Sequence, residues 1–368
     1  MRRSTKIAVV LAAATLALAG CAKDDKDSDS DSNSGGSTST TLDCDSLSGD
    51  GPKVGIAYDV GGQGDHSFND AAAQGMKEAN EQLSATCTEG EAAKDEPESA
   101  REERLRQMAD AGFNPIIGVG FAYSDSVDAV SDEYKDISFG VVDGFDPTPN
   151  KDGSSNNPNV AYLGFAENEG SFLVGVAAAE TTKSDHIGFV GGVHNDLIKK
   201  FEAGYTAGAK AVNPNIKVDV QYIEESDLGG FNDPAGGKAA ASAMYDNGAD
   251  VVFQVAGASG SGVFDAAVDA GDGMWAIGVD GDQWASASSA QKPHILTSML
   301  KRVDVATVDM ITSVDNGKPL TNYQVYDLAK DGVGYATSGD FLSQELQDEI
   351  NGYADQIKNG DIEVPTTP

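Results

Sequence analysis

Cysteine, histidine and basic residues are scarce in this sequence of 368 residues. It contains three cysteines and four histidines, and its 25 Lys and Arg residues face 59 Asp and Glu residues, which gives a formal charge of −34. Three cysteines are too few for a disulfide-rich scaffold. A chain this acidic lacks the clustered cations that displace counterions from a phosphate backbone. DNA and RNA are therefore excluded as polymer partners.

The sequence also lacks a hydrophobic run long enough for a transmembrane helix. The run from Ile7 to Ala19 is interrupted only by Thr15, and a membrane-spanning helix needs about 20 residues. Three basic residues precede the run, so residues 1–20 are predicted to be a secretory signal peptide. The segment Leu18-Ala19-Gly20-Cys21 resembles the lipobox of bacterial lipoproteins, which implies that Cys21 is lipidated and becomes the mature N-terminus. The alternative is an ordinary signal peptide that ends in a chance cysteine.

A polar segment, residues 21–50, follows the predicted cleavage point. Residues 22–50 are mainly Asp, Ser, Gly and Thr, and such a composition buries too little apolar surface to offset its ordering entropy. We expect a disordered acidic tether that is anchored by the lipid on Cys21. Cys44 and Cys87 remain, and outside the cytosol a disulfide between them would attach the end of the tether to the folded body. Two unpaired thiols are the alternative.

From residue 53 onward, short apolar runs alternate with longer amphipathic stretches. The predicted strands are 54–60, 115–121, 138–144, 160–165, 186–192, 217–223, 250–255 and 274–281. The predicted helices lie near 68–84, 98–111, 124–135, 168–183, 195–212, 234–247 and 260–271. This alternation is typical of βαβ units on parallel sheets whose two faces are covered by helices.

The eight strands could form one wide sheet, but their two similar sets favour an α/β fold with two doubly wound parallel-sheet lobes joined by a hinge. A further strand at 295–300 and a helix at 302–316 indicate that the chain crosses back to the first lobe. The predicted first lobe comprises 51–164 with about 296–320, and the predicted second lobe comprises 165–295 with about 321–340. Residues 341–368 are predicted to form a C-terminal helix and tail.

Polar residues and glycines follow several of these strands, at the positions where open α/β sheets bind ligands. Three strands are followed by carboxylates, namely Asp59, Asp143 and Asp280. A glycine-rich turn at 257–262 follows another, and Phe68 lies at the start of a helix that Ser67 is predicted to cap. Such a set is suited to a polyhydroxylated ring compound. Asp, Gly and Asn are also common turn residues, which is the alternative for each of them.

No catalytic set emerges from the sequence. The segment Ser298-Met299-Leu300-Lys301 matches the Ser-x-x-Lys pattern of penicillin-recognising enzymes, but both companion motifs are missing and the segment alternates like a strand. The turn at 257–262 is neither a nucleophile elbow nor a Walker loop, and its glycines would instead give backbone amides close access to a ligand. The histidines without metal-ligand spacing are His66, His186, His194 and His294. We therefore expect no enzyme, no metal and no cofactor.

An ordered series of motifs resembles the basic membrane protein family, which comprises substrate-binding lipoproteins of ABC transporters and includes a purine nucleoside receptor. The motifs are Asp59-Val60-Gly61-Gly62, Ser67-Phe68-Asn69, 169–175, 201–205, Ala256-Gly257, Gly278-Val279-Asp280, Asp282-Gln283 and 298–302. The resemblance covers about residues 53–330. The sequence departs from the family pattern at Gly64 and His66, where the family usually has an aspartate and a lysine on either side of Asp65.

The resemblance implies a ligand site between the two lobes. The implied ligand-binding residues are Asp59, Phe68, Asn69, Asp143, Phe201, Gly257, Asp280 and Lys301. Phe68 and Phe201 would stack on the two faces of a purine base, while Asp280 with Lys301 would hold the ribose hydroxyls. The polar residues of the first lobe would bind other polar edges of the ligand. Without the family, both phenylalanines are interpreted as helix core residues.

Together these inferences predict a lipid-anchored solute-binding protein on the extracytoplasmic side of the cell membrane. Its lobes would close over a nucleoside, with a purine favoured, and the closed form would deliver the nucleoside to ABC permease subunits. A binding protein of the same fold for a sugar or another small polar solute is the alternative. A nucleoside hydrolase is a third hypothesis, although the sequence lacks the cluster of neighbouring aspartates that would hold calcium.

Overall fold

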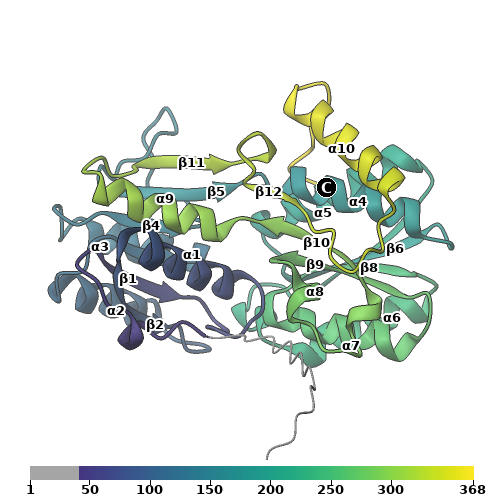
Figure 1. Cartoon of the computed structure of the whole chain (residues 1–368), viewed down its shortest axis with the longest axis horizontal. Coiled ribbons are helices and arrows are strands. Elements are labelled where there is room, and N and C mark those ends of the chain that lie inside the picture. Colours follow the sequence, from purple (N-terminus) through teal and green to yellow (C-terminus); the bar gives the residue numbers. More distant parts are fainter. Residues whose placement is uncertain (1–40) are drawn as a thin grey trace, which may run out of the picture. The chain divides into compact units, whose positions relative to one another are not determined.

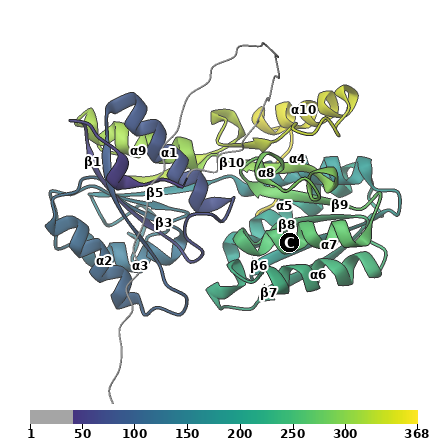
Figure 2. The ribbon, with the colours of Figure 1, turned by 60° about the horizontal axis from the view of Figure 1, so that its bottom comes forward.

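The computed structural model describes residues 41–368. The predicted signal peptide, the lipidation residue Cys21 and the tether up to residue 40 lie outside the described residues. In the described part, the strands form two six-stranded sheets with helices on both faces (Figures 1 and 2). None of the helices described in residues 41–368 has the length and apolar character needed to cross a bilayer.

The first lobe is built on a sheet in which every neighbouring pair of strands is parallel. Its strand order is β11-β5-β4-β3-β1-β2. The strands are β1 (Lys53–Tyr58), β2 (Thr86–Glu91), β3 (Ile116–Val119), β4 (Phe139–Val142), β5 (Val160–Phe165) and β11 (Asn322–Tyr326). The helices are α1 (Phe68–Leu83), α2 (Glu98–Asp110), α3 (Ser124–Ser131) and α9 (Val303–Asp315). Helices α1 and α9 pack together, as do α2 and α3, so both faces of the apolar central strands are covered.

The second lobe repeats this arrangement with the strand order β12-β10-β9-β8-β6-β7, and only the β10–β12 pair is antiparallel. The strands are β6 (His186–Val193), β7 (Lys217–Glu224), β8 (Val251–Val255), β9 (Trp275–Asp280), β10 (Ile295–Lys301) and β12 (Val333–Tyr335). The helices are α4 (Glu167–Thr181), α5 (Asp196–Val212), α6 (Pro234–Asp246), α7 (Gly260–Ala270), α8 (Gln283–Ser286) and α10 (Gln344–Lys358). The predicted α/β fold with two doubly wound lobes is confirmed.

Helices α4 and α5 pack unusually close together because glycines lie at their contact. A Cβ atom on Gly204 would lie 2.1 Å from the backbone oxygen of Asn168, and one on Gly208 would lie 2.0 Å from that of Phe172. A side chain at either position would force the helices apart. The glycines of the motifs at 169–175 and 201–205 therefore serve packing, and this packing fixes where α5 presents Phe201.

The chain passes between the sheets three times, after β5, after β10 and between β11 and β12. The predicted assignment of 296–320 to the first lobe was wrong for its strand, because β10 pairs with β9 in the second sheet. The assignment of 321–340 to the second lobe was wrong for β11, which pairs with β5 in the first sheet. Helix α9 does lie in the first lobe, packed on α1, and α10 packs on α4 of the second lobe. The last two crossings between the sheets thus each come one element later in the chain than predicted.

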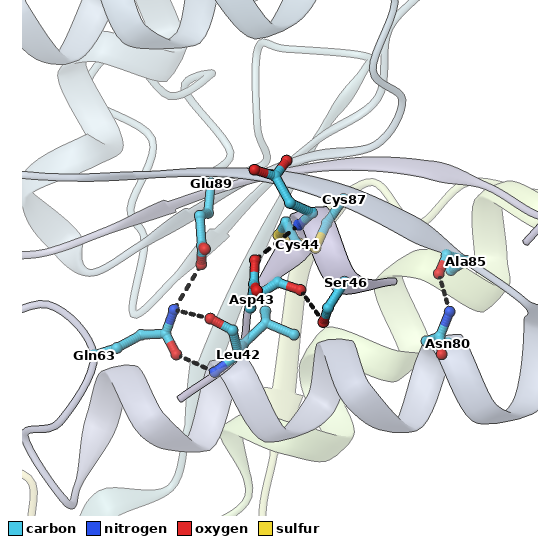
Figure 3. Close-up of a disulfide and its surroundings, with 10 residues drawn as sticks. Leu42, Asp43, Cys44, Ser46, Gln63, Asn80, Ala85, Cys87 and Glu89 are labelled. Atoms are coloured by element: carbon cyan, nitrogen blue, oxygen red, sulfur yellow. Dashed lines mark hydrogen bonds between the residues drawn. A yellow bond between two sulfur atoms is a disulfide. The ribbon is translucent and has the colours of Figure 1, made fainter. Parts of the chain in front are cut away.

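The end of the predicted tether is packed against the first lobe (Figure 3). Leu42 and Cys44 are only 3% and 7% exposed, so the prediction of disorder through residue 50 was wrong for this end. Cys44 forms a disulfide with Cys87 of β2. The Gln63 side chain, from the loop before α1, accepts a hydrogen bond from the Leu42 amide and donates one to the Leu42 carbonyl. The segment is therefore held both covalently and by hydrogen bonds.

Removing the disulfide is expected to lower the free energy of unfolding by about 4 kcal/mol, because the bond closes a loop with a sequence separation of 43 residues. The comparison is between the wild type and a Cys44→Ala/Cys87→Ala variant in denaturant titrations, with intact mass under oxidising and reducing conditions to verify the bond. Leu42→Ala keeps the disulfide and measures the packing of the segment separately. A double variant as stable as the wild type would contradict the prediction.

Candidate ligand-binding site

The carboxyl ends of the strands in both sheets border one cavity between the lobes. All eight residues predicted for the ligand site line this cavity: Asp59, Phe68, Asn69, Asp143, Phe201, Gly257, Asp280 and Lys301. They come from the ends of β1, β4, β8, β9 and β10 and from the first halves of α1 and α5. The site is thus formed where parallel sheets bind ligands, at the ends of the strands and the starts of the following helices.

Two aromatic rings from different lobes surround one lysine in the cavity. The Lys301 Nζ lies 5.0 Å from the ring centroid of Phe68 and 5.5 Å from that of Phe201. A third ring, that of Phe165, lies 5.0 Å from the same atom. Phe68 is half-buried, whereas Phe201 is only 2% exposed and belongs to the hydrophobic core. Phe201 is therefore a core residue that also lines the cavity.

Lys301 is almost completely buried and is compensated by carboxylates. Its Nζ lies 2.5 Å from Asp143 Oδ2 and 3.9 Å from Glu167 Oε1. Burial alone would lower the pKa of Lys301, but the nearby carboxylates of Asp143, Glu167 and Asp280 outweigh it and raise the pKa above its ordinary value. The ammonium group is therefore charged at neutral pH. The sequence suggested Asp280 as its partner, whereas the structure pairs it directly with Asp143.

Asp280 receives a hydrogen bond from the other lobe. It ends β9 with a φ of +66°, and its Oδ2 accepts a hydrogen bond of 2.6 Å from the Ser67 hydroxyl. Burial raises the pKa of this carboxyl, while Lys301 and the Ser67 hydroxyl oppose the shift. Ser67 lies at the predicted N-cap position of α1, but its side chain makes no capping hydrogen bond. Its hydroxyl is instead used between the lobes.

The capping role belongs to Asp65, which the sequence reasoning did not select. Its carboxylate accepts hydrogen bonds from the backbone amides of Ser67, Asn69 and Asp70 and from the side-chain amide of Asn69. These contacts hold the first turn of α1, from which Phe68 and Asn69 enter the cavity. An aspartate three residues before Phe68 is the only signal in the sequence that could have indicated this.

Asp59 and Asn69 form a second polar group at the cavity wall. Asn69 Oδ1 accepts a hydrogen bond from the Asp59 amide, and Asp59 Oδ1 accepts one from the Val60 amide. The Arg101 Nη2 lies 4.0 Å from Asp59 Oδ1. Burial raises the pKa of Asp59 to about 6, although the Val60 amide and Arg101 both oppose the shift. The side chain of Asn69 is thus partly occupied by contacts within the protein.

The raised pKa of Asp59 predicts a stability that falls as pH rises from about 4 to about 6. The folded state keeps this proton in that range, while the unfolded chain, with a carboxyl pKa near 3.8, has lost it. Unfolding therefore releases a proton and is favoured by rising pH, at a cost of about 3 kcal/mol over the range. Denaturant titrations of wild type and Asp59→Asn across pH 4–7 check this. Parallel pH profiles for the two proteins would contradict it.

Several residues that line the cavity were not predicted because they are apolar. They are Val60, Phe121, Leu197, Ile198, Phe231, Val255, Ala256, Ala258 and Val279. Leu197 and Ile198 lie in the first turn of α5, which the Asn195 side chain caps by accepting a hydrogen bond from the Ile198 amide. An apolar residue at the start of a helix cannot be told from core by its sequence alone. Together with Phe68 and Phe201 they give the cavity a mainly apolar lining with a few polar groups.

The arrangement gives no support to an acylating serine. Ser298 is fully buried in β10, and its Oγ accepts a hydrogen bond from the Gln283 amide. Lys301 is engaged by Asp143 rather than by Ser298. Gly257 has a φ of +55° in the turn before α7, which places its backbone at the cavity. In residues 41–368, no group of three or more His, Cys, Asp and Glu side chains is placed to hold a metal ion.

Comparisons with known proteins agree with this architecture. A family model described as "ABC transporter substrate-binding protein PnrA-like" matches residues 53–368. The ABC transporter nucleoside-binding protein BmpA of Lactococcus lactis is 34% identical over 85% of this chain and 89% of its own length. The CD4+ T-cell-stimulating antigen of Listeria monocytogenes is 36% identical over 86% of this chain and 88% of its own.

Solved structures share the fold. An ABC transporter solute-binding protein from Aeropyrum pernix superimposes with a TM-score of 0.71 at 24% identity, over 86% of this chain and 93% of that one. One from Conexibacter woesei gives a TM-score of 0.67 at 23% identity, over 86% of this chain and 99% of that one. The two-lobed arrangement is thus the type I fold of solute-binding proteins. The match of the family model over residues 53–368 shows that the chain belongs to the PnrA-like family of ABC transporter substrate-binding proteins.

Proposed function

We propose that this protein is the nucleoside receptor of an ABC importer, with a purine nucleoside as the favoured ligand. The observation that carries the proposal is the cavity itself, where Phe68 and Phe201 from different lobes border the same space together with the carboxylates of Asp143 and Asp280. Flat aromatic rings suit a base, and carboxylates suit the hydroxyls of a ribose. The name of the Lactococcus lactis relative supports the same ligand class.

The charges of the cavity favour a neutral ligand over a phosphorylated one. Among the described residues 41–368, Lys301 is the only cation that lines it, and Asp59, Asp65, Asp143 and Asp280 line it as well. The ammonium group is already compensated by Asp143. A nucleotide phosphate would therefore meet excess negative charge in a poorly solvated space, whereas a nucleoside carries no such penalty.

Each of the eight residues predicted for the ligand site has a role in this proposal. Phe68 and Phe201 stack on the base, and Asp280 and Asp143, with Lys301 between them, bind the ribose hydroxyls. Asp59 and Asn69 contact a polar edge of the base, and the backbone amide of Gly257 supplies a further donor. Because these residues come from both lobes, the ligand stabilises the form in which the lobes are close together.

The same proposal covers location and delivery. Lipidation at Cys21 would anchor the protein on the extracytoplasmic side of the cell membrane. The closed, ligand-loaded form would dock on the permease, and opening of the lobes would release the nucleoside. The protein itself would carry out no chemistry on the ligand.

A calorimetric panel tests the ligand class. Inosine, guanosine, adenosine, cytidine and uridine are compared with inosine monophosphate, ribose, glucose and amino acids, using the mature chain without its lipid. Binding of purine nucleosides with much weaker binding of the monophosphate is the expected result. Binding of a sugar but of no nucleoside would move the assignment to a sugar receptor. Release of free base on prolonged incubation with inosine would show a hydrolase instead.

A further inference from the structure

Four residues join the two lobes beside the cavity, and we call this group the inter-lobe seam. His66 and Ser67 come from the loop before α1 of the first lobe, and Asp280 and Gln283 come from the second lobe. The Ser67 hydroxyl donates to Asp280 Oδ2 at 2.6 Å, and the Gln283 Nε2 donates to the His66 carbonyl oxygen at 3.1 Å. His66, Ser67 and Gln283 do not line the ligand cavity.

The second-lobe side of the seam is held in place by contacts within its own lobe. Gln283 is 3% exposed, and its Oε1 accepts hydrogen bonds from Gln254 Nε2 at 2.6 Å and from the Val279 amide at 2.9 Å. Its own backbone amide donates to Ser298 Oγ. These contacts all lie within the second lobe and fix the carboxamide, so that its Nε2 is directed at the His66 carbonyl.

The first-lobe side is equally constrained. Asp70 accepts hydrogen bonds from the amides of Gly64 and His66, and Asp65 accepts those of Ser67 and Asn69. The loop therefore presents the His66 carbonyl and the Ser67 hydroxyl to the second lobe in a defined orientation. Two preorganised surfaces lose little conformational entropy when they join, so their hydrogen bonds contribute effectively to closure.

The seam also separates two hollows. Asp280 and Lys301 line both the ligand cavity and a second groove, and that groove is lined by His66 and Ser67 as well. The hydrogen bonds of the seam therefore lie in the wall between them. Forming the seam closes this side of the cavity to solvent, and it also occupies Oδ2 of Asp280, which leaves Oδ1 for a ligand.

We propose that the inter-lobe seam sets the equilibrium between open and closed forms, and that Gln283 and Ser67 are positioning residues which raise ligand affinity without contacting the ligand. The inference rests on the proposed function for its ligand but not for the closure itself. Because apparent affinity scales with the population of the binding-competent form, a weaker seam lowers affinity and speeds dissociation. It also gives a role to the motif positions Gln283 and Ser298, for which the ligand site has no use.

The test measures closure with and without ligand. Spin labels at Gln107 of α2 and Ala243 of α6, two exposed helix positions on different lobes, report the distance between the lobes. Ser67→Ala removes only the hydroxyl of the seam. Gln283→Glu keeps the side chain's size and its Oε1 but replaces the donor to His66 by an acceptor. Ser286→Ala is the matched control, because among residues 41–368 its hydroxyl bonds only to the Gln283 carbonyl within α8.

Longer label distances in the ligand-free seam variants are expected, with the control unchanged. For inosine we expect about a tenfold weaker affinity, mostly through faster dissociation, in Ser67→Ala. Unchanged distances together with an unchanged dissociation rate would overturn the proposal. If the wild type binds no nucleoside, the proposed function fails. The distances between the spin labels without ligand would still test whether the seam controls closure. Wild-type distances shorter than those of both variants would support it, and equal distances would overturn it.

Discussion

Replacing Lys301 with methionine is expected to lower the free energy of unfolding by about 3–5 kcal/mol, because it leaves buried carboxylates without their counter-charge. Lys301 is 2% exposed, and its ammonium group lies 2.5 Å from Asp143 Oδ2 and 3.9 Å from Glu167 Oε1. Within residues 41–368, Asp143 Oδ1 and Glu167 Oε1 have no hydrogen-bond partner. These carboxylates would then have to protonate or admit water, and either response costs free energy.

Lys200 supplies a matched control for this substitution. Its Nζ lies 3.2 Å from Glu167 Oε2, but its side chain is 36% exposed. Lys200→Met is therefore expected to cost less than Lys301→Met, because its ammonium group is partly solvated and the buried Glu167 keeps Lys301 3.9 Å from its Oε1. Asp143→Asn in the Lys301→Met background should recover part of the loss, since one uncompensated charge is removed. Equal destabilisation by Lys301→Met and Lys200→Met in denaturant titrations would contradict the buried-pair argument.

The helices and most strands could be predicted because buried elements require a clear pattern of apolar and polar residues in the sequence. The strands β1, β3, β4, β6 and β8 are apolar runs, and nearly all of their residues are buried. Strand β2, with the sequence TCTEGE, was missed because it lies at a sheet edge and is only partly buried. Strand β11, which is mostly exposed at the opposite edge, was missed for the same reason. An edge strand is only partly covered by neighbouring elements, so it needs fewer apolar residues. Its sequence therefore resembles the sequence of a loop.

The error in the sheet assignment of β10 has a different physical cause. An apolar run shows that a strand is buried, but it does not show which sheet the strand joins. That choice depends on backbone pairing with β9, where Leu300 lies beside Asp280. The hydrogen bonds of that pairing are made by backbone atoms and are independent of side-chain identity. Only the three-dimensional path of the chain determines it.

The polar part of the site could be predicted, whereas its apolar part and its packing could not. Asp59 and Asp143 stand directly after strands and Asp280 ends one, and parallel sheets bring such positions to one edge. Leu197, Ile198 and Phe231 carry no comparable signal, because apolar side chains serve core and cavity equally well. The partner of Lys301 also could not be predicted, since Asp143 and Asp280 lie at the ends of strands in different lobes.

Replacing Phe68 with alanine is expected to weaken nucleoside binding by about 10- to 100-fold, since stacking of a base on an aromatic ring is worth roughly 1–3 kcal/mol. Phe68 is the better of the two stacking residues to test. Phe201 is 2% exposed in the core, so Phe201→Ala would cost about 3–5 kcal/mol of stability and would confuse a binding measurement. Phe68 is half-buried in the first turn of α1, so truncation should leave the fold intact.

Calorimetry with a purine nucleoside on Phe68→Ala, Phe68→Trp and Phe145→Ala separates stacking from general loss of apolar surface. Phe68→Trp retains a flat ring and should keep most of the affinity. Phe145 is 46% exposed, two residues beyond Asp143, and does not line the cavity, so its truncation should leave binding unchanged. A Phe68→Ala variant that binds as tightly as the wild type would remove Phe68 from the ligand site. The base would then have to be held by Phe201 and the polar residues alone, and the two-sided stacking that favours a nucleoside over a sugar would be lost.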